Sequence, residues 1–145
     1  MTGFEDLEVY KIAIQFRQKI FELAKSFPPE EKYRLIDQII RSTRKCPANI
    51  AEGYGRFHYQ ENIQFSRIAR GSLTETQDHL NCVSECKYIS QEQHTDLKAD
   101  AIQLIKMING YIRLYLEIFC MQLTLSFSDT LHLFFAPYRR VCSSK

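Results

Sequence analysis

Apolar residues recur at helical spacing through most of this 145-residue chain, and this feature constrains its fold more than any other. Only four prolines and five glycines interrupt the chain. Because so few residues break the pattern, we expect long helices rather than many short strands. The length suits one domain with a substantial core, and the charged fraction of 25% is typical of a soluble globular protein.

The apolar pattern predicts four helices, over about residues 4–26, 31–51 and 60–88 and from Ser90 onward. Pro28 and Pro29 interrupt the first two, because proline lacks a backbone donor and restricts the residue before it. Gly53 is placed to end the second helix, and Ser90 followed by Gln93 is a capping-box signal for the fourth. Four helices joined by short loops predict an all-α fold, an antiparallel up-down four-helix bundle.

We expect the bundle to occupy residues 1–119 and to be followed by a C-terminal tail, residues 120–145, whose structure the pattern leaves undecided. A short helix or strand folding back, an interface segment and a disordered end are all open. The tail is too broken by polar residues to span a membrane, which needs about 20 mostly apolar residues. No basic and apolar leader opens the chain, so we expect a cytoplasmic protein.

The first predicted helix is apolar on two sides. Its two stripes are Leu7, Tyr10, Ile14, Phe21 and Ala24, and Val9, Ala13, Phe16, Ile20, Leu23 and Phe27. One stripe can face the bundle core, whereas the other needs a second cover from a neighbouring helix or a neighbouring subunit. The need to cover both stripes indicates a homo-oligomer.

Positive charge gathers in the middle of the chain. Residues 32–70 hold eight basic and three acidic residues, although the whole chain has a net charge of only +2. The candidate nucleic-acid-contacting residues are Arg34, Arg41, Arg44, Lys45, Arg56, Arg67 and Arg70. Those on the second helix share one face, and Tyr54, Phe57 and Tyr59 would add stacking groups beside Arg56. Such a face fits RNA or DNA phosphates or a merely solvated surface about equally well, and an acidic protein partner less well.

The sequence contains no recognisable catalytic or metal-binding pattern. Its five cysteines form no Cys-x-x-Cys pair, and neither a Glu-x-x-His repeat, a Gly-x-Ser-x-Gly elbow nor a phosphate-binding loop occurs. His79, Cys82 and Cys86 can share one helix face, but ordinary packing explains them better than a metal site. We therefore expect a protein that is not an enzyme and needs no cofactor or metal.

The most distinctive cluster lies around the end of the second predicted helix. It comprises Pro47, Asn49, Glu52, Gly53, Tyr54 and Gly55. Pro47 should kink the helix, and Asn49 and Glu52 are placed to satisfy freed polar groups or to hold Arg56. We interpret the cluster as structural, because two glycines alone do not form a phosphate cradle.

Gly71 and Ser72 lie in the middle of the third predicted helix. A glycine there costs about 1 kcal/mol relative to alanine. Its presence suggests that the backbone of another helix approaches closely.

Three stretches of the chain resemble the family of proteins encoded in intervening sequences of bacterial 23S ribosomal RNA genes. They are FEDLEVYKIA near the start, CPANIAEGYGR at residues 46–56 and FSRIARGSLTETQDHL at residues 65–80. The resemblance extends from Phe4 to about Leu116 and is most specific in the middle stretch. One departure is Lys87, which stands where relatives commonly have glycine, and another is the tail after about Cys120.

The resemblance implies an antiparallel four-helix bundle, often assembled as a pentamer, without known enzymatic activity. The family also resembles a related branch, the accessory proteins of diversity-generating retroelements. These are basic pentamers that engage a reverse transcriptase and nucleic acid. Two functions are therefore expected. The first is an oligomeric binding or scaffold module whose basic face engages nucleic acid or a protein that handles it. The alternative is a purely structural, self-assembling bundle with a protein partner and no nucleic-acid binding.

Overall fold

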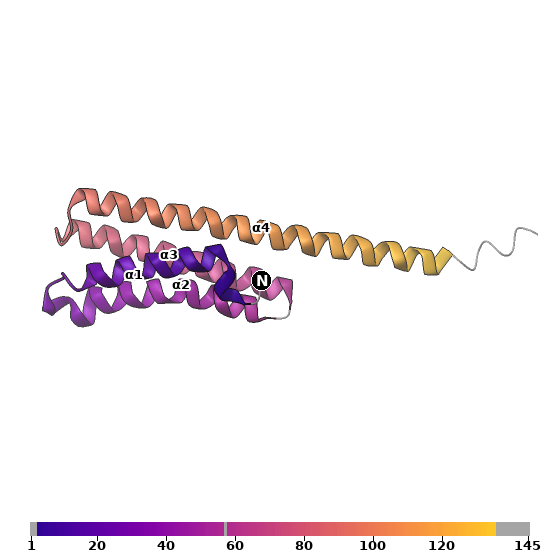
Figure 1. Cartoon of the computed structure of the whole chain (residues 1–145), viewed down its shortest axis with the longest axis horizontal. Coiled ribbons are helices and arrows are strands. Elements are labelled where there is room, and N and C mark those ends of the chain that lie inside the picture. The colour runs from indigo at the N-terminus through magenta and orange to yellow at the C-terminus, as the bar shows by residue number, and fades with distance from the viewer. Residues whose placement is uncertain (1–2, 57, 136–145) are drawn as a thin grey trace, which may run out of the picture.

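The computed structural model describes residues 3–56 and 58–135, with side chains placed up to residue 122. Its main elements are the α-helices α1 (Glu8–Ala24), α2 (Asp37–Gly55), α3 (Tyr59–Glu85) and α4 (Gln91–Phe135). Figure 1 shows these helices side by side, with the chain reversing direction between successive helices. The described residues contain no strand, and the expectation of an all-α four-helix bundle is confirmed.

Short turns precede both of the first two helices. A 3-10 turn η1 (Phe4–Asp6) is followed by Leu7 in an extended conformation, so α1 begins at Glu8 rather than near Phe4. After Pro28, a 3-10 turn η2 (Pro29–Glu31) and a π-helical turn η3 (Lys32–Ile36) lead into α2. The second α-helix therefore begins later than the apolar pattern predicts, because the proline pair imposes its own turn geometry first.

The core draws on all four helices. Its fully buried side chains include Ile20 of α1, Ile39 and Ile50 of α2, Leu73 and Leu80 of α3, and Leu104 and Ile108 of α4. A small polar cluster lies between α2 and α3, where the Thr76 hydroxyl donates to Ser42 Oγ at 2.9 Å and lies 3.4 Å from Thr43 Oγ1. Ser42, Thr43 and Thr76 also bond to carbonyls of their own helices, so these buried hydroxyls are satisfied.

The cysteines within the described residues, Cys46, Cys82, Cys86 and Cys120, are free thiols. Cys46 lies in the core, and its burial raises the pKa of the thiol to about 12. It is therefore protonated and inert at neutral pH, because the thiolate is the reactive form.

The second helix passes through Pro47 and ends only at Gly55. Gly53 does not end the helix as the sequence predicts. Instead it is buried against α3, where an added Cβ would lie 2.9 Å from Phe65 Cβ and 3.3 Å from the carbonyl oxygen of Asn62. The glycine thus allows the α2 and α3 backbones to approach closely.

The connection between α3 and α4 combines a left-handed residue with a helix cap. Lys87 adopts a φ of 59°, and the Tyr88 amide donates to the carbonyl of Val83 at 3.1 Å. Ser90 and Gln93 bond reciprocally, each backbone amide donating to the other's side chain, at 3.0 and 3.1 Å. The predicted capping box is therefore confirmed.

Replacing Lys87 by glycine is expected to raise the free energy of unfolding by about 1 kcal/mol. A left-handed conformation is unfavourable for an L-residue with a Cβ and costs about 1–2 kcal/mol. Lys106→Gly is the matched control, because it removes an exposed lysine inside α4 and should destabilise by about 1 kcal/mol. Chemical denaturation of the three proteins measures both effects, and a loss of stability in Lys87→Gly would contradict the argument.

The fourth helix passes the expected domain boundary at residues 119 and 120 without a break. Gln122 Nε2 lies 3.5 Å from the hydroxyl of Tyr59, the first residue of α3. Beyond this point α4 extends past the other helices, as Figure 1 shows. The helical continuation therefore covers much of the segment that the sequence left undecided, and residues 136–145 lie outside the described residues.

Candidate nucleic-acid interface

The basic residues of η3 and α2 are exposed, but their side chains reach in different directions. Arg41 lies 3.6 Å from the Asp37 carboxylate of its own helix, whereas Lys45 lies 3.6 Å from Glu75 of α3. Arg44 is placed over the ring of Phe21 in α1. The Arg34 side chain has no ion-pair partner among the described residues. The basic face expected on the second helix is thus spread over α2 and its contacts with α1 and α3.

The basic face of α2 does not continue into one surface with Arg56, Arg67 and Arg70. Arg56 donates to Glu52 at 2.6 Å, and this hydrogen bond raises the pKa of its guanidinium. Arg70 reaches the other side of α3 and donates to Asn109 of α4 at 2.7 Å. Arg67 is exposed.

The aromatic residues expected to stack beside Arg56 are largely engaged within the bundle. The Tyr59 ring packs against Tyr115 with the ring centroids 5.7 Å apart, and Tyr54 packs against the core. Arg56 itself lies 5.0 Å from the ring centroid of Phe65. Phe57 lies outside the described residues.

The tyrosines of α4 form a hydrogen-bonded group with α3. Asn62 Nδ2 donates to the Tyr111 hydroxyl at 3.3 Å, and that hydroxyl donates to Tyr115 at 3.2 Å. Burial, together with the bond to Tyr115, raises the pKa of Tyr111. These groups act as structural hydrogen-bond partners, because a tyrosine that holds its proton is no acid or base at neutral pH.

Polar residues of the motif at the end of α2 bond to residues of the same helix or of its C-cap. Asn49 donates to the carbonyl of Lys45 at 2.6 Å, and Glu52 holds Arg56. Pro47 and Gly53 are buried, Tyr54 is partly buried, and Gly55 is exposed. The contacts of Glu52 match the expectation that it positions Arg56, whereas Asn49 bonds a carbonyl other than the Thr43 carbonyl that Pro47 leaves without its helical donor.

The prediction of a close helix approach at Gly71 is wrong. An added Cβ at Gly71 would meet no heavy atom within 4 Å among the described residues, because this glycine lies on the exposed face of α3. Ser72 beside it is buried and donates to the carbonyl of Ile68. The close approach that a glycine permits occurs at Gly53 instead.

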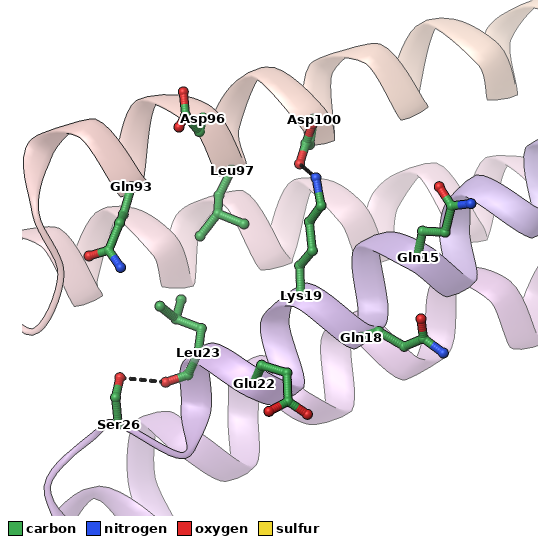
Figure 2. Close-up of a pocket in the computed structure, with 10 residues that line it drawn as sticks. All are labelled: Gln15, Gln18, Lys19, Glu22, Leu23, Ser26, Gln93, Asp96, Leu97 and Asp100. Atoms are coloured by element: carbon green, nitrogen blue, oxygen red, sulfur yellow. Dashed lines mark hydrogen bonds and ion pairs between the residues drawn. The ribbon is translucent and has the colours of Figure 1, made fainter.

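An open groove of about 810 Å³ runs between α1 and the start of α4. Figure 2 shows Leu23 and Leu97 between the two helices and the Lys19–Asp100 ion pair, 2.6 Å long, crossing from one helix to the other. Glutamine and acidic side chains line the remainder of the groove, together with Ser26, whose hydroxyl donates to the Leu23 carbonyl. It holds no arrangement of nucleophile and base, and the described residues contain no group of three His, Cys, Asp or Glu side chains placed to hold a metal ion.

Sequence reasoning missed two surface features. One is this groove, which depends on the spacing of two helices far apart in the chain. The other is Arg17 of α1, whose guanidinium carbon lies 5.8 Å from the ring centroid of Phe21. Arg17 and Ala24 are seven residues apart, so they lie on one side of α1. Only the packing of α2 shows that Arg44 faces this side.

The fold and these surfaces define a class of protein, an all-helical bundle that offers open surfaces between its helices. Among the described residues, no helix is both long and apolar enough to cross a membrane. The sequence pattern of the 23S rRNA-intervening sequence protein family matches residues 5–110. The chain belongs to this family.

A solved structure supports the same assignment. The chain is similar to a protein of unknown function from the S23 ribosomal protein family of Bacteroides thetaiotaomicron VPI-5482, with 27% sequence identity and a TM-score of 0.67. The alignment covers 72% of this chain and 97% of that one. Comparison with curated proteins gives no match. The family match ends at residue 110, so the C-terminal part of α4 lies outside it.

Proposed function

We propose that this protein is a non-enzymatic, self-assembling scaffold that binds other macromolecules, and that the C-terminal part of α4 mediates its assembly. The observation that carries the proposal is the extension of α4 beyond the helices that could cover it. A helix in water needs its apolar surface covered by other elements. A second copy of the chain supplies that cover.

Large apolar side chains are exposed where α4 leaves the bundle. Leu114, Leu116 and Met121 are 52%, 40% and 63% exposed. The helix then continues through residues 123–135, whose sequence LTLSFSDTLHLFF holds seven leucines or phenylalanines and a single charged residue, Asp129. Burial of such residues stabilises association by roughly 25 cal/mol per Å² of apolar surface.

The stripe of α1 that suggested an oligomer is partly covered within the chain. Phe4 packs edge-on against Tyr10, and Arg17 and Arg44 lie over Phe21. This intramolecular cover moves the expected interface from α1 to α4. A homo-oligomer, with the pentamer as the first state to test, remains the proposed assembly.

Light scattering at micromolar concentration tests this assembly. We expect a mass that is a multiple of 17.1 kDa for the unaltered chain and a much smaller mass for the variant Leu114→Lys/Leu116→Lys/Met121→Lys. Lysine keeps helical propensity but opposes burial of the surface. Ile102→Lys is the matched control, because Ile102 is 42% exposed on α4 but lies within the family bundle.

A monomeric mass for the unaltered chain would overturn the assembly. Equal dissociation in the triple variant and in Ile102→Lys would show that the C-terminal part of α4 is not the interface. Circular dichroism of each variant checks that its helices are retained.

Nucleic-acid binding through the basic residues is the second candidate function. The supporting observation is that the ion pairs of Arg41 and Lys45 are exposed on both sides, with side chains 41–61% accessible. Such surface pairs contribute about 0–1 kcal/mol, so phosphate groups can compete with the carboxylates. RNA or DNA, or a protein that handles them such as a reverse transcriptase, is the partner of this function. The competing candidate is a purely structural assembly with a protein partner alone, which predicts no salt-dependent binding of RNA or DNA.

A further inference from the structure

Two arginines from different helices converge on one aromatic ring at the seam of α1 and α2. The guanidinium carbon of Arg17 lies 5.8 Å from the ring centroid of Phe21, and that of Arg44 lies 5.1 Å from it. Both contacts are of the cation–π kind, which holds a guanidinium in a defined orientation over a ring. The Phe21 ring therefore acts as a platform for two positive charges.

Among the described residues, no carboxylate pairs with the charges at this seam. Elsewhere the cations Arg41, Lys45 and Arg56 each have a carboxylate within 4 Å. Among the described ion pairs, none involves Arg17 or Arg44. Two like charges near a single ring repel each other, and a nearby anion would remove that cost.

Arg17 also carries an unsatisfied donor. Its Nε is buried and has no hydrogen-bond partner among the described residues. A buried donor without a partner costs about 1–3 kcal/mol, and such groups in a native structure call for an explanation. Because this nitrogen is buried, a bound anion would balance the charge of the Arg17 guanidinium without bonding to Nε.

We propose that Arg17 and Arg44 form a phosphate-binding site for a strand of nucleic acid. The proposal deepens the second candidate function, on which it rests. Guanidinium groups match phosphate oxygens in a bidentate manner, and the Phe21 platform orients both groups in advance. Arg41, exposed and three residues before Arg44 on α2, extends the positive surface toward a neighbouring phosphate. Because the ring already carries two guanidiniums, the site contacts phosphates and does not read bases.

The test is the affinity of the full chain for a labelled single-stranded RNA at two salt concentrations. The variant Arg17→Gln/Arg44→Gln should bind about tenfold more weakly at low salt. The slope of the logarithm of affinity against the logarithm of salt concentration should become shallower by about 0.7 for each phosphate that the variant no longer neutralises. The matched control is Lys98→Gln/Lys106→Gln, which removes the same charge from exposed lysines of α4 outside the candidate set and should bind almost as the unaltered chain.

Each further outcome has a distinct meaning. If both double variants lose the same affinity for RNA, the effect depends only on net charge, and the proposed site is overturned. Unchanged binding by Arg17→Gln/Arg44→Gln would also overturn it, while leaving nucleic-acid binding in place. No binding by the unaltered chain at low salt would remove the second candidate function itself. Thermal unfolding checks that the glutamine variants fold, and Arg17→Lys/Arg44→Lys, which keeps the charge but loses the planar forks, should lose affinity with a nearly unchanged salt slope.

Discussion

Replacing Gly53 by alanine is expected to lower the free energy of unfolding by up to about 2 kcal/mol. The added methyl group would lie 2.9 Å from Phe65 Cβ and 3.3 Å from the carbonyl oxygen of Asn62. Both contacts belong to the α3 backbone or to an atom fixed to it, so the two helices must separate, and such overpacking costs about 1–3 kcal/mol. The gain in helix propensity, about 1 kcal/mol, offsets only part of this cost.

Gly71→Ala is the matched control, and the opposite sign is expected for it. An alanine at this exposed position meets open space, so the variant should gain about 1 kcal/mol from helix propensity alone. Denaturant unfolding of the two variants under the same conditions provides the comparison. Stabilisation of both variants would contradict the close packing of α2 on α3. A lower assembly mass for Gly71→Ala would instead show that another copy of the chain covers this face of α3.

Leu104→Ala is expected to destabilise the bundle by about 2–5 kcal/mol. Leu104 is fully buried in α4, and its truncation removes apolar contacts and leaves a cavity. Leu114→Ala makes the same change on the same helix, but Leu114 is 52% exposed, so the unfolding of a single chain should change by less than about 0.5 kcal/mol.

The two leucine variants also separate folding from assembly. Stability measured at low protein concentration should fall for Leu104→Ala, whereas the concentration dependence of stability should change for Leu114→Ala, because association stabilises the folded chain by mass action. A loss of single-chain stability in Leu114→Ala as large as that in Leu104→Ala would show that this part of α4 folds against its own bundle.

The helices and much of their inward faces follow from local patterning. Helical spacing identifies inward residues such as Ile39, Leu73 and Ile108 without knowledge of their partners, because one face of a helix must be buried. The capping box at Ser90 is equally local, since both of its hydrogen bonds join residues three apart. These features could be predicted because each depends on residues close in the chain.

The roles of individual glycines and charges could not be predicted in the same way. Gly53 and Gly71 look alike in sequence, yet only the first lies against another helix. Lys45 and Arg44 are neighbours in sequence, but one pairs with α3 and the other lies over a ring of α1. The element that packs beside a given helical turn is determined by tertiary structure. It cannot be predicted from residue spacing or composition. The seam formed by Arg17 and Arg44 was missed for this reason.

The uninterrupted course of α4 has a consequence for how copies of the chain would be oriented in the proposed assembly. Because the buried residues Leu104 and Ile108 and the exposed Leu116 belong to one helix, the bundle and the assembly surface are joined by a rod rather than by a linker. Inserting one residue between them would turn the assembly surface by about 100° around the helix axis, whereas seven would return it to within about 20° of its original direction. In the proposed assembly, the angular phase of α4, and not only the chemistry of its surface, therefore sets which sides of neighbouring bundles face each other.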